Sequence, residues 1–144
     1  MAPISESALP LRPTLTLAVA ERAIAAATVE AERQGVRVTI AVVDDGGHIV
    51  SLRRMDGVHT GTVDVAIAKA RTAAGFRRPS RLLAQGLAAG ATALLALPGC
   101  LPIEGGVPLC VSDQVIGAVG VSGAAPTIDD AIAEAGNAAL LAAS

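Results

Sequence analysis

Hydrophobic and polar positions change their spacing along this chain, and each change predicts a new element. In residues 15–34 apolar side chains recur every three or four positions, which indicates an amphipathic helix with Thr14 as its cap and Gly35 as its end. Residues 36–43 then alternate at strand spacing, and a second strand-like run follows at 48–55. Asp-Asp-Gly-Gly joins these runs, and Asp and Gly tolerate the positive φ angles of tight turns. The pattern therefore predicts a helix followed by a β-hairpin.

The rest of the chain predicts more helices and a second hairpin. The further elements are a helix at 62–74 ended by Gly75, a helical segment from Pro79-Ser80, hairpin strands at 108–112 and 115–122 turning about Asp113-Gln114, and a last helix from Thr127 to about Ala142. Because hairpins imply antiparallel strands, we expect an α/β (α+β) domain in which helices cover one face of an antiparallel sheet. Glycines within 115–123 indicate that another segment packs very closely there.

Composition narrows the class of protein. A chain of 144 residues suits one folded domain, which we place at residues 15–144 behind an N-terminal arm at 1–14. The net charge of −2 and the single aromatic residue, Phe76, argue against nucleic-acid binding, which uses clustered basic charge and aromatic platforms. No apolar run reaches the roughly 20 residues of a membrane-spanning helix, and the arm does not resemble a signal peptide. We therefore expect a cytoplasmic protein in which both cysteines, Cys100 and Cys110, are reduced.

Several separate blocks resemble the GlcG/HbpS-type family, in the same order along the chain. They are 43–48 (Val-Asp-Asp-Gly-Gly-His), Arg54-Met55-Asp56-Gly57, 68–73 (Ala-Lys-Ala-Arg-Thr-Ala), 105–109 (Gly-Gly-Val-Pro-Leu), 116–123 and the acidic helix start at Asp129-Asp130. The resemblance covers about residues 15–140. It implies a profilin-like α/β/α fold and assembly into homo-oligomers. Members include haem-binding proteins, a domain of PduO-type corrinoid adenosyltransferases, and proteins encoded beside glycolate oxidation enzymes, so the resemblance says more about fold than about chemistry.

The polar segment at the end of the second predicted strand is the first candidate site. His59 carries an imidazole that suits a haem-iron ligand or a general acid/base, and Asp56 is placed to orient it. Arg53 and Arg54 point to opposite faces of the strand, so at most one faces a pocket, where it can pair with a carboxylate or a haem propionate. Met55 lies between these groups. The alternatives are structural: a local hydrogen bond for His59, and helix capping or arginine pairing for Asp56.

A glycine pair and a helical lysine form the second candidate group. Backbone N–H groups of Gly105 and Gly106 can converge on an anion, and Glu104 is the carboxylate placed to act there. The alternative is a glycine pair that approaches a strand edge closely. Lys69 either reaches a ligand carboxylate across a subunit boundary or lies with its stem along its neighbours. We expect Lys69 and the glycine pair to complete the pocket of residues 53–59.

Three functions follow from these candidates. The first is an oligomeric protein that binds a small ligand: a small organic acid, or haem held noncovalently, since no Cys-x-x-Cys-His attachment motif is present. The second is a cofactor-independent enzyme of isomerase, lyase or hydrolase type, in which an arginine binds a small carboxylate and His59, Asp56 or Glu104 moves protons. The third is an assembly module without chemistry of its own. The scarcity of aromatic residues argues against haem, because haem pockets usually draw on them.

Overall fold

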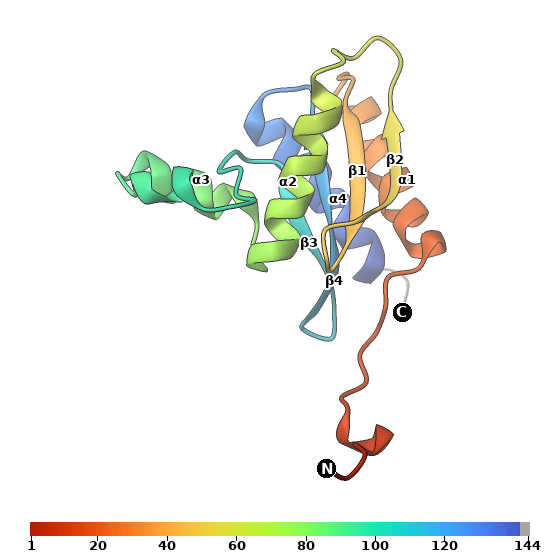
Figure 1. Cartoon of the computed structure of the whole chain (residues 1–144). Coiled ribbons are helices and arrows are strands. Elements are labelled where there is room, and N and C mark those ends of the chain that lie inside the picture. The colour runs from red at the N-terminus through yellow and green to blue at the C-terminus, as the bar shows by residue number, and fades with distance from the viewer. Residues whose placement is uncertain (142–144) are drawn as a thin grey trace.

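A four-stranded antiparallel sheet in the order β2-β1-β4-β3 forms the centre of the computed structural model, which describes residues 1–141 (Figure 1). The strands are β1 (Thr39–Asp44), β2 (Ile49–Arg54), β3 (Gly106–Val111) and β4 (Gln114–Ser122). The helices are α1 (Leu17–Arg33), α2 (Thr62–Phe76), α3 (Ser80–Ala88) and α4 (Pro126–Leu141), with short 3-10 helices η1 (Glu6–Ala8) and η2 (Thr92–Ala96). The predicted α+β class with an antiparallel sheet is confirmed.

Both predicted hairpins are present. In the first turn, Asp44 Oδ1 accepts hydrogen bonds from the backbone N–H groups of His48 (3.0 Å) and Gly46 (2.9 Å). These bonds, with His48 contributing most, hold the pKa of the Asp44 carboxyl below its usual range. The second turn centres on Ser112 and Asp113, whose φ angles are 49° and 63°. It lies one residue earlier than predicted, because Asp113 takes the second left-handed position of the turn and not the first.

Helices cover both faces of the sheet, which corrects the expectation of one covered face and agrees with the α/β/α layering that the family resemblance implies. In Figure 1 α2 lies on one side of the sheet, and α1 and α4 lie on the other. Ile40 and Val42 of β1 pack in the core with α1 and α4, whereas Val43 packs against the alanines of α2. An uninterrupted apolar run such as 40–43 is typical of a strand buried on both faces. That signal was present in the sequence.

Glycines let α2 lie very close to the sheet. A Cβ added to Gly120 of β4 would overlap the carbonyl oxygen of Ala66, and a Cβ added to Gly106 of β3 would overlap the carbonyl oxygen of Lys69. Neither overlap can be relieved without moving backbone, so α2 is fixed over the middle of the sheet. The close approach predicted from glycines in 115–123 is confirmed.

Element boundaries differ from the sequence prediction in small ways. The side chain of Thr16 caps α1, and not that of Thr14. α2 continues through Gly75 to Phe76, and Arg77, which follows as its C-cap, adopts a left-handed conformation with φ 53°. The predicted end of the last helix, Ala142, lies outside the described residues.

Two segments extend away from the three layers (Figure 1). Residues 1–14 are exposed throughout, and an ion pair between Arg12 and Asp45 ties their end to the first hairpin turn. α3 projects beyond α2, on the side of the molecule away from α1, and η2 packs against α3. None of the helices within residues 1–141 is long and apolar enough to cross a membrane.

Candidate ligand-binding site

The outward side of α2 presents one continuous stripe of side chains. Asp64 lies three and four positions before Ile67 and Ala68, and Arg71 lies four and three positions after them, so all four lie on one face of the helix. Ala70 and its buried neighbours on the opposite face pack against the sheet. The stripe is therefore available to form the wall of a surface site, while the other side of the same helix is part of the core.

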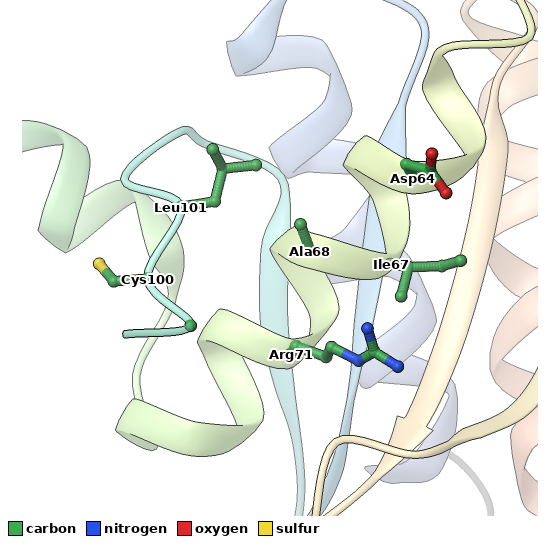
Figure 2. Close-up of a pocket in the computed structure, with 7 residues that line it drawn as sticks. Asp64, Ile67, Ala68, Arg71, Cys100 and Leu101 are labelled. Carbon is green, nitrogen blue, oxygen red and sulfur yellow. The ribbon is translucent and has the colours of Figure 1, made fainter. Parts of the chain in front are cut away.

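A hollow in the surface lies along this stripe. It has a volume of about 500 Å³ and is lined by the four stripe residues together with Gly99, Cys100 and Leu101. Figure 2 shows the stripe on α2 and, beside it, the loop that carries Cys100 and Leu101. Aliphatic side chains form much of the wall, and a carboxylate, a guanidinium and a thiol supply the polar groups. Size and lining are typical of small-molecule sites, which range over roughly 300–1,000 Å³.

Thr72 fixes the loop that forms the second wall. Its Oγ1 accepts a hydrogen bond from the backbone N–H of Leu101 (2.8 Å). The single hydroxyl proton is shared between the carbonyl oxygens of Ala68 (2.7 Å) and Gly99 (3.2 Å). Thr72 is itself fully buried. A buried, fully bonded hydroxyl thus holds the loop against α2, which gives the hollow a defined width.

Arg71 lines both this hollow and a second one. Its Nε donates to the carbonyl oxygen of Gly47 in the first hairpin turn (2.9 Å). The second hollow has a volume of about 310 Å³ and is lined by Asp45, Gly46, Gly47, Arg71, Gly75, Phe76, Pro98 and Gly99. Because Arg71 and Gly99 line both hollows, the two form one groove along the outward side of α2.

Cys100 contributes the one sulfur among the residues that line the groove. The side chain is half-buried, and burial raises the pKa of its thiol above the ordinary value. It is therefore a neutral thiol near neutral pH, and any partner that needs the thiolate must displace a proton.

The structure spreads residues 53–59 over different surroundings. Arg53 and Arg54 are both exposed. Arg53 donates to Thr28 Oγ1 on α1 (3.0 Å), and Arg54 lies on the opposite face of β2. Met55 is half-buried against the core on the α1 side. The two arginines do point to opposite faces, as the strand pattern predicts.

Asp56 and His59 follow in the exposed connection to α2. The carbonyl oxygen of Asp56 accepts a hydrogen bond from Arg37 Nη1 (3.3 Å). The carbonyl oxygen of His59 accepts from the backbone N–H (3.1 Å) and Oγ1 (2.6 Å) of Thr62. Asp56 and His59 take part in these contacts through their backbone oxygens only, so the side chains of both residues are available to solvent. Neither side chain lines either hollow.

Lys69 lies in the core with the glycine pair. Its side chain is 2% exposed, and Nζ donates to the carbonyl oxygen of Val121 (2.9 Å) and to Asp129 Oδ2 (3.0 Å). Gly105 faces the same ammonium group, since a Cβ there would lie 2.9 Å from Nζ. The backbone N–H of Gly106 donates to Ser80 Oγ (2.8 Å). The structure thus brings Lys69, Gly105 and Gly106 together, in a buried position.

Asp129 completes this buried group. Oδ1 accepts a hydrogen bond from the backbone N–H of Ala124 (2.9 Å), while Oδ2 faces Lys69. Burial raises the pKa of the Asp129 carboxyl, and the adjacent Lys69 ammonium acts in the opposite direction. Both carboxylate oxygens and the ammonium have partners, which is how a buried charge pair is tolerated.

Glu104 lies beside another charged cluster. Arg81 of α3 bridges Asp130 (3.3 Å) and Glu134 (2.6 Å) of α4. Burial raises the pKa of the Asp130 carboxyl, and the negative charges of Glu134 and Glu104 raise it further. Glu104 therefore belongs to the β3 side of the molecule, near α4.

The two predicted groups lie at opposite edges of the sheet. Arg54 pairs with Thr39, and Gly106 pairs with Gly120, so both lie toward the same end of the strands. β1 and β4 separate them, and strands spaced about 4.8 Å apart place the edge strands roughly 14 Å from each other. The structure does not gather residues 53–59, Lys69 and the glycine pair around one pocket.

The sequence analysis missed the residues that line the groove. The sequence places Asp64 and Ile67 in a helix and nothing more, and it predicts only that Cys100 is reduced. A signal was available for Arg71, because it lies in the family-like block at 68–73, two residues after Lys69. Helical spacing places Lys69 and Arg71 on different faces, so only one of them can face the core.

Comparison with known proteins agrees with this architecture. A family model described as "Haem degrading protein HbpS-like" matches residues 15–138. Protein GlcG of Escherichia coli (strain K12) is 43% identical over 108 residues, which cover 75% of this chain and 81% of that protein. The chain belongs to the HbpS-like family.

Solved structures share the whole fold. A double mutant of HbpS from Streptomyces reticuli is 36% identical, with a TM-score of 0.85 over 97% of each chain. Protein ORFY of Klebsiella pneumoniae is 27% identical, with a TM-score of 0.89 over 99% of this chain and 100% of that one. Family and fold are thus established together, and the family resemblance stated from the sequence blocks is confirmed.

Proposed function

We propose that this protein binds haem noncovalently, in the groove along the outward side of α2. The observation that carries this proposal is the hollow of about 500 Å³, found in a chain whose family model is described by haem chemistry. The small organic acid considered from the sequence is the alternative ligand. The groove, and not the segment at 53–59, is the site that we assign.

The lining residues fit a porphyrin in three respects. Ile67, Ala68 and Leu101 offer aliphatic surface to the macrocycle. Arg71 offers a guanidinium, which binds carboxylates such as propionates through paired hydrogen bonds. Cys100 offers sulfur, and a cysteine thiolate is an established axial ligand of haem iron. Bound haem would supply iron-centred redox or ligand-binding chemistry, and the protein would supply the orientation and the exclusion of water.

Cys100 and His59 are the two candidate iron ligands of this proposal. Cys100 lines the hollow, whereas the His59 side chain lies outside it in the exposed connection before α2. Position therefore favours Cys100 as the ligand. His59 remains the alternative that its imidazole chemistry suggests, and exchanging each residue separately decides between them.

A hemin titration of the purified protein tests the proposal. We expect a saturable Soret band at one haem per chain, a changed band and weaker binding in Cys100→Ser, and an unchanged band in His59→Ala. Cys110→Ser is the matched control, because Cys110 lies on β3 and does not line the groove. The absence of a saturable band in the wild-type protein would overturn haem binding. Loss of the band in His59→Ala alone would move the site to residues 53–59.

The enzyme alternative has less geometric support. It needs an acid, a base and a cation around one substrate, but Glu104 lies on the β3 side, whereas Asp56 and His59 follow β2 at the other edge. Thermal-shift screening with glycolate-like and unsaturated acids tests it. Stabilisation by such an acid that is lost in His59→Ala would favour the enzyme over the haem protein.

We also propose that the protein forms homo-oligomers, as the family resemblance implies. Large apolar side chains of the N-terminal arm, Ile4, Leu9 and Leu11, are exposed. Such exposed apolar groups are typical of segments that pack against a second subunit. Light scattering after size-exclusion chromatography tests this: a mass near one chain would contradict it, and so would an oligomer unaffected by removal of residues 2–11.

A further inference from the structure

The guanidinium of Arg71 is held in place by a hydrogen bond from Nε, while its two Nη groups form no ion pair within residues 1–141. Its Nε is bonded to the carbonyl oxygen of Gly47 (2.9 Å), and its stem lies against the same glycine, since a Cβ there would be 3.4 Å from Arg71 Cγ. Within residues 1–141 no carboxylate lies within 4.0 Å of its guanidinium nitrogens. The two Nη groups are thus held in place while they stay available for a ligand.

Three other cations of the chain are already paired with carboxylates. Arg12 pairs with Asp45, and Arg81 bridges two carboxylates of α4. Lys69 is buried against Asp129. Of the residues that line the larger hollow, Arg71 is the one cation. An anionic group in this hollow has a single positively charged partner among the lining residues.

Asp64 and Arg71 place opposite charges at the two ends of the hollow. Asp64 and Arg71 line the same hollow seven positions apart on α2, which corresponds to about 10 Å along the helix axis. They make no ion pair with each other. A ligand with negative charge at one end is attracted to the Arg71 end and repelled from the Asp64 end, while the aliphatic wall between them contacts an apolar body.

We propose that Arg71 is the carboxylate anchor of this groove, so that its ligands are flat or elongated apolar molecules with carboxylate at one end only. The inference rests on the proposed function, because it assumes that the groove is the binding site. The Nη edge of a guanidinium presents two parallel N–H donors to one carboxylate, and the bond from Nε to Gly47 fixes the plane of that fork before the ligand arrives. Preorganisation of this kind strengthens binding because less side-chain freedom is lost.

The test compares hemin with hemin dimethyl ester, which keeps the macrocycle and iron but has no carboxylate. We expect the wild-type protein to bind hemin about 10- to 100-fold more tightly than the ester, the range of one paired hydrogen bond to a charged group. Arg71→Gln should bind both porphyrins with nearly equal affinity, close to that of the wild-type protein for the ester. Arg71→Lys should keep part of the preference, because it retains the charge without the planar fork.

Arg22→Gln is the matched control, because Arg22 lies exposed on α1 on the other side of the sheet. It should keep the full preference for hemin. Thermal unfolding of each variant without ligand checks that the fold is intact. Equal affinity of the wild-type protein for both porphyrins, or a preference that survives in Arg71→Gln, would overturn the anchor while leaving haem binding standing. Failure of the wild-type protein to bind either porphyrin would overturn the proposed function and the anchor with it.

Discussion

Lys69 and Arg71 lie two residues apart on α2, yet their surroundings have little in common. The Lys69 side chain is 2% exposed, and its ammonium donates to a carbonyl oxygen and to the Asp129 carboxylate. Arg71 is exposed, and one bond to Gly47 holds it over the groove. The inward charge is neutralised and enclosed, whereas the outward charge is positioned and left available. The face of the helix, and not the type of residue, separates structural from ligand-binding roles here.

Several separate contacts fix the structure on the inward side of α2. The Asp129 carboxylate accepts hydrogen bonds from the backbone N–H of Ala124 and from Lys69 Nζ. Gly105 and Gly106 leave room for the lysine side chain and for the backbone of α2. The outward side depends on two attachments, the Thr72 hydroxyl and the Arg71 guanidinium, to hold two loops. We therefore expect substitutions on the inward side to change stability, and those on the outward side to change binding.

Asp129→Ala should give the largest effect. It leaves the Lys69 ammonium buried without its counter-charge, which typically costs about 3–5 kcal/mol in free energy of unfolding. Urea denaturation measures the loss. Asp64→Ala, which removes a carboxylate from the outward side of α2, should change stability by no more than about 0.5 kcal/mol. Similar losses in the two variants would contradict the distinction between the faces.

Gly106→Ala should come next. The added Cβ would overlap the Lys69 carbonyl oxygen, and relieving such an overlap by backbone shifts costs typically about 1–3 kcal/mol, occasionally more. Gly75→Ala is the matched control, because a Cβ there meets no atom within 4 Å. It should stabilise α2, by up to about 1 kcal/mol. Thermal unfolding of both variants checks the prediction, and a stable Gly106→Ala protein would show that α2 is not fixed by this contact.

The pH dependence of hemin binding should give the smallest effect. Burial raises the pKa of the free Cys100 thiol, so at neutral pH the thiol is protonated and an iron–sulfur bond releases its proton. Affinity should therefore rise with pH, by about tenfold per pH unit at most, until the pH passes the thiol pKa. Hemin titrations at a series of pH values measure the slope. Cys110→Ser should keep it, and a slope that persists in Cys100→Ser would exclude the thiol as its source.

Sequence reasoning predicted the elements better than the site, for physical reasons. The hairpins, the helix at 62–74 and the close approach at the β4 glycines follow from local spacing and turn chemistry, which act within a few residues. Which faces of the sheet are covered was harder to predict. The apolar run at 40–43 indicates a strand buried on both sides, but hairpin connections argue for one open face. The structure resolves that conflict in favour of burial.

The groove could not be predicted in the same way, because tertiary contacts create it. Cys100 meets the outward side of α2 only because Thr72 binds the backbone of Leu101, 29 residues away in sequence. Arg71 is held by a turn 24 residues before it. Residues 53–59 drew attention instead because their polar chemistry is contiguous in sequence, and their role as a site stays a prediction.

The location of bound hemin tests the central claim most directly. Ferric iron broadens amide resonances of nearby residues in ¹H–¹⁵N spectra, and zinc protoporphyrin provides a diamagnetic control for shifts caused by binding alone. Binding in the groove predicts loss of the Ala68, Gly99 and Leu101 signals at low hemin ratios, while signals of residues 53–59 persist. Broadening centred on residues 53–59, with the signals of Gly99 and Leu101 retained, would contradict the assignment of the site to the outward side of α2.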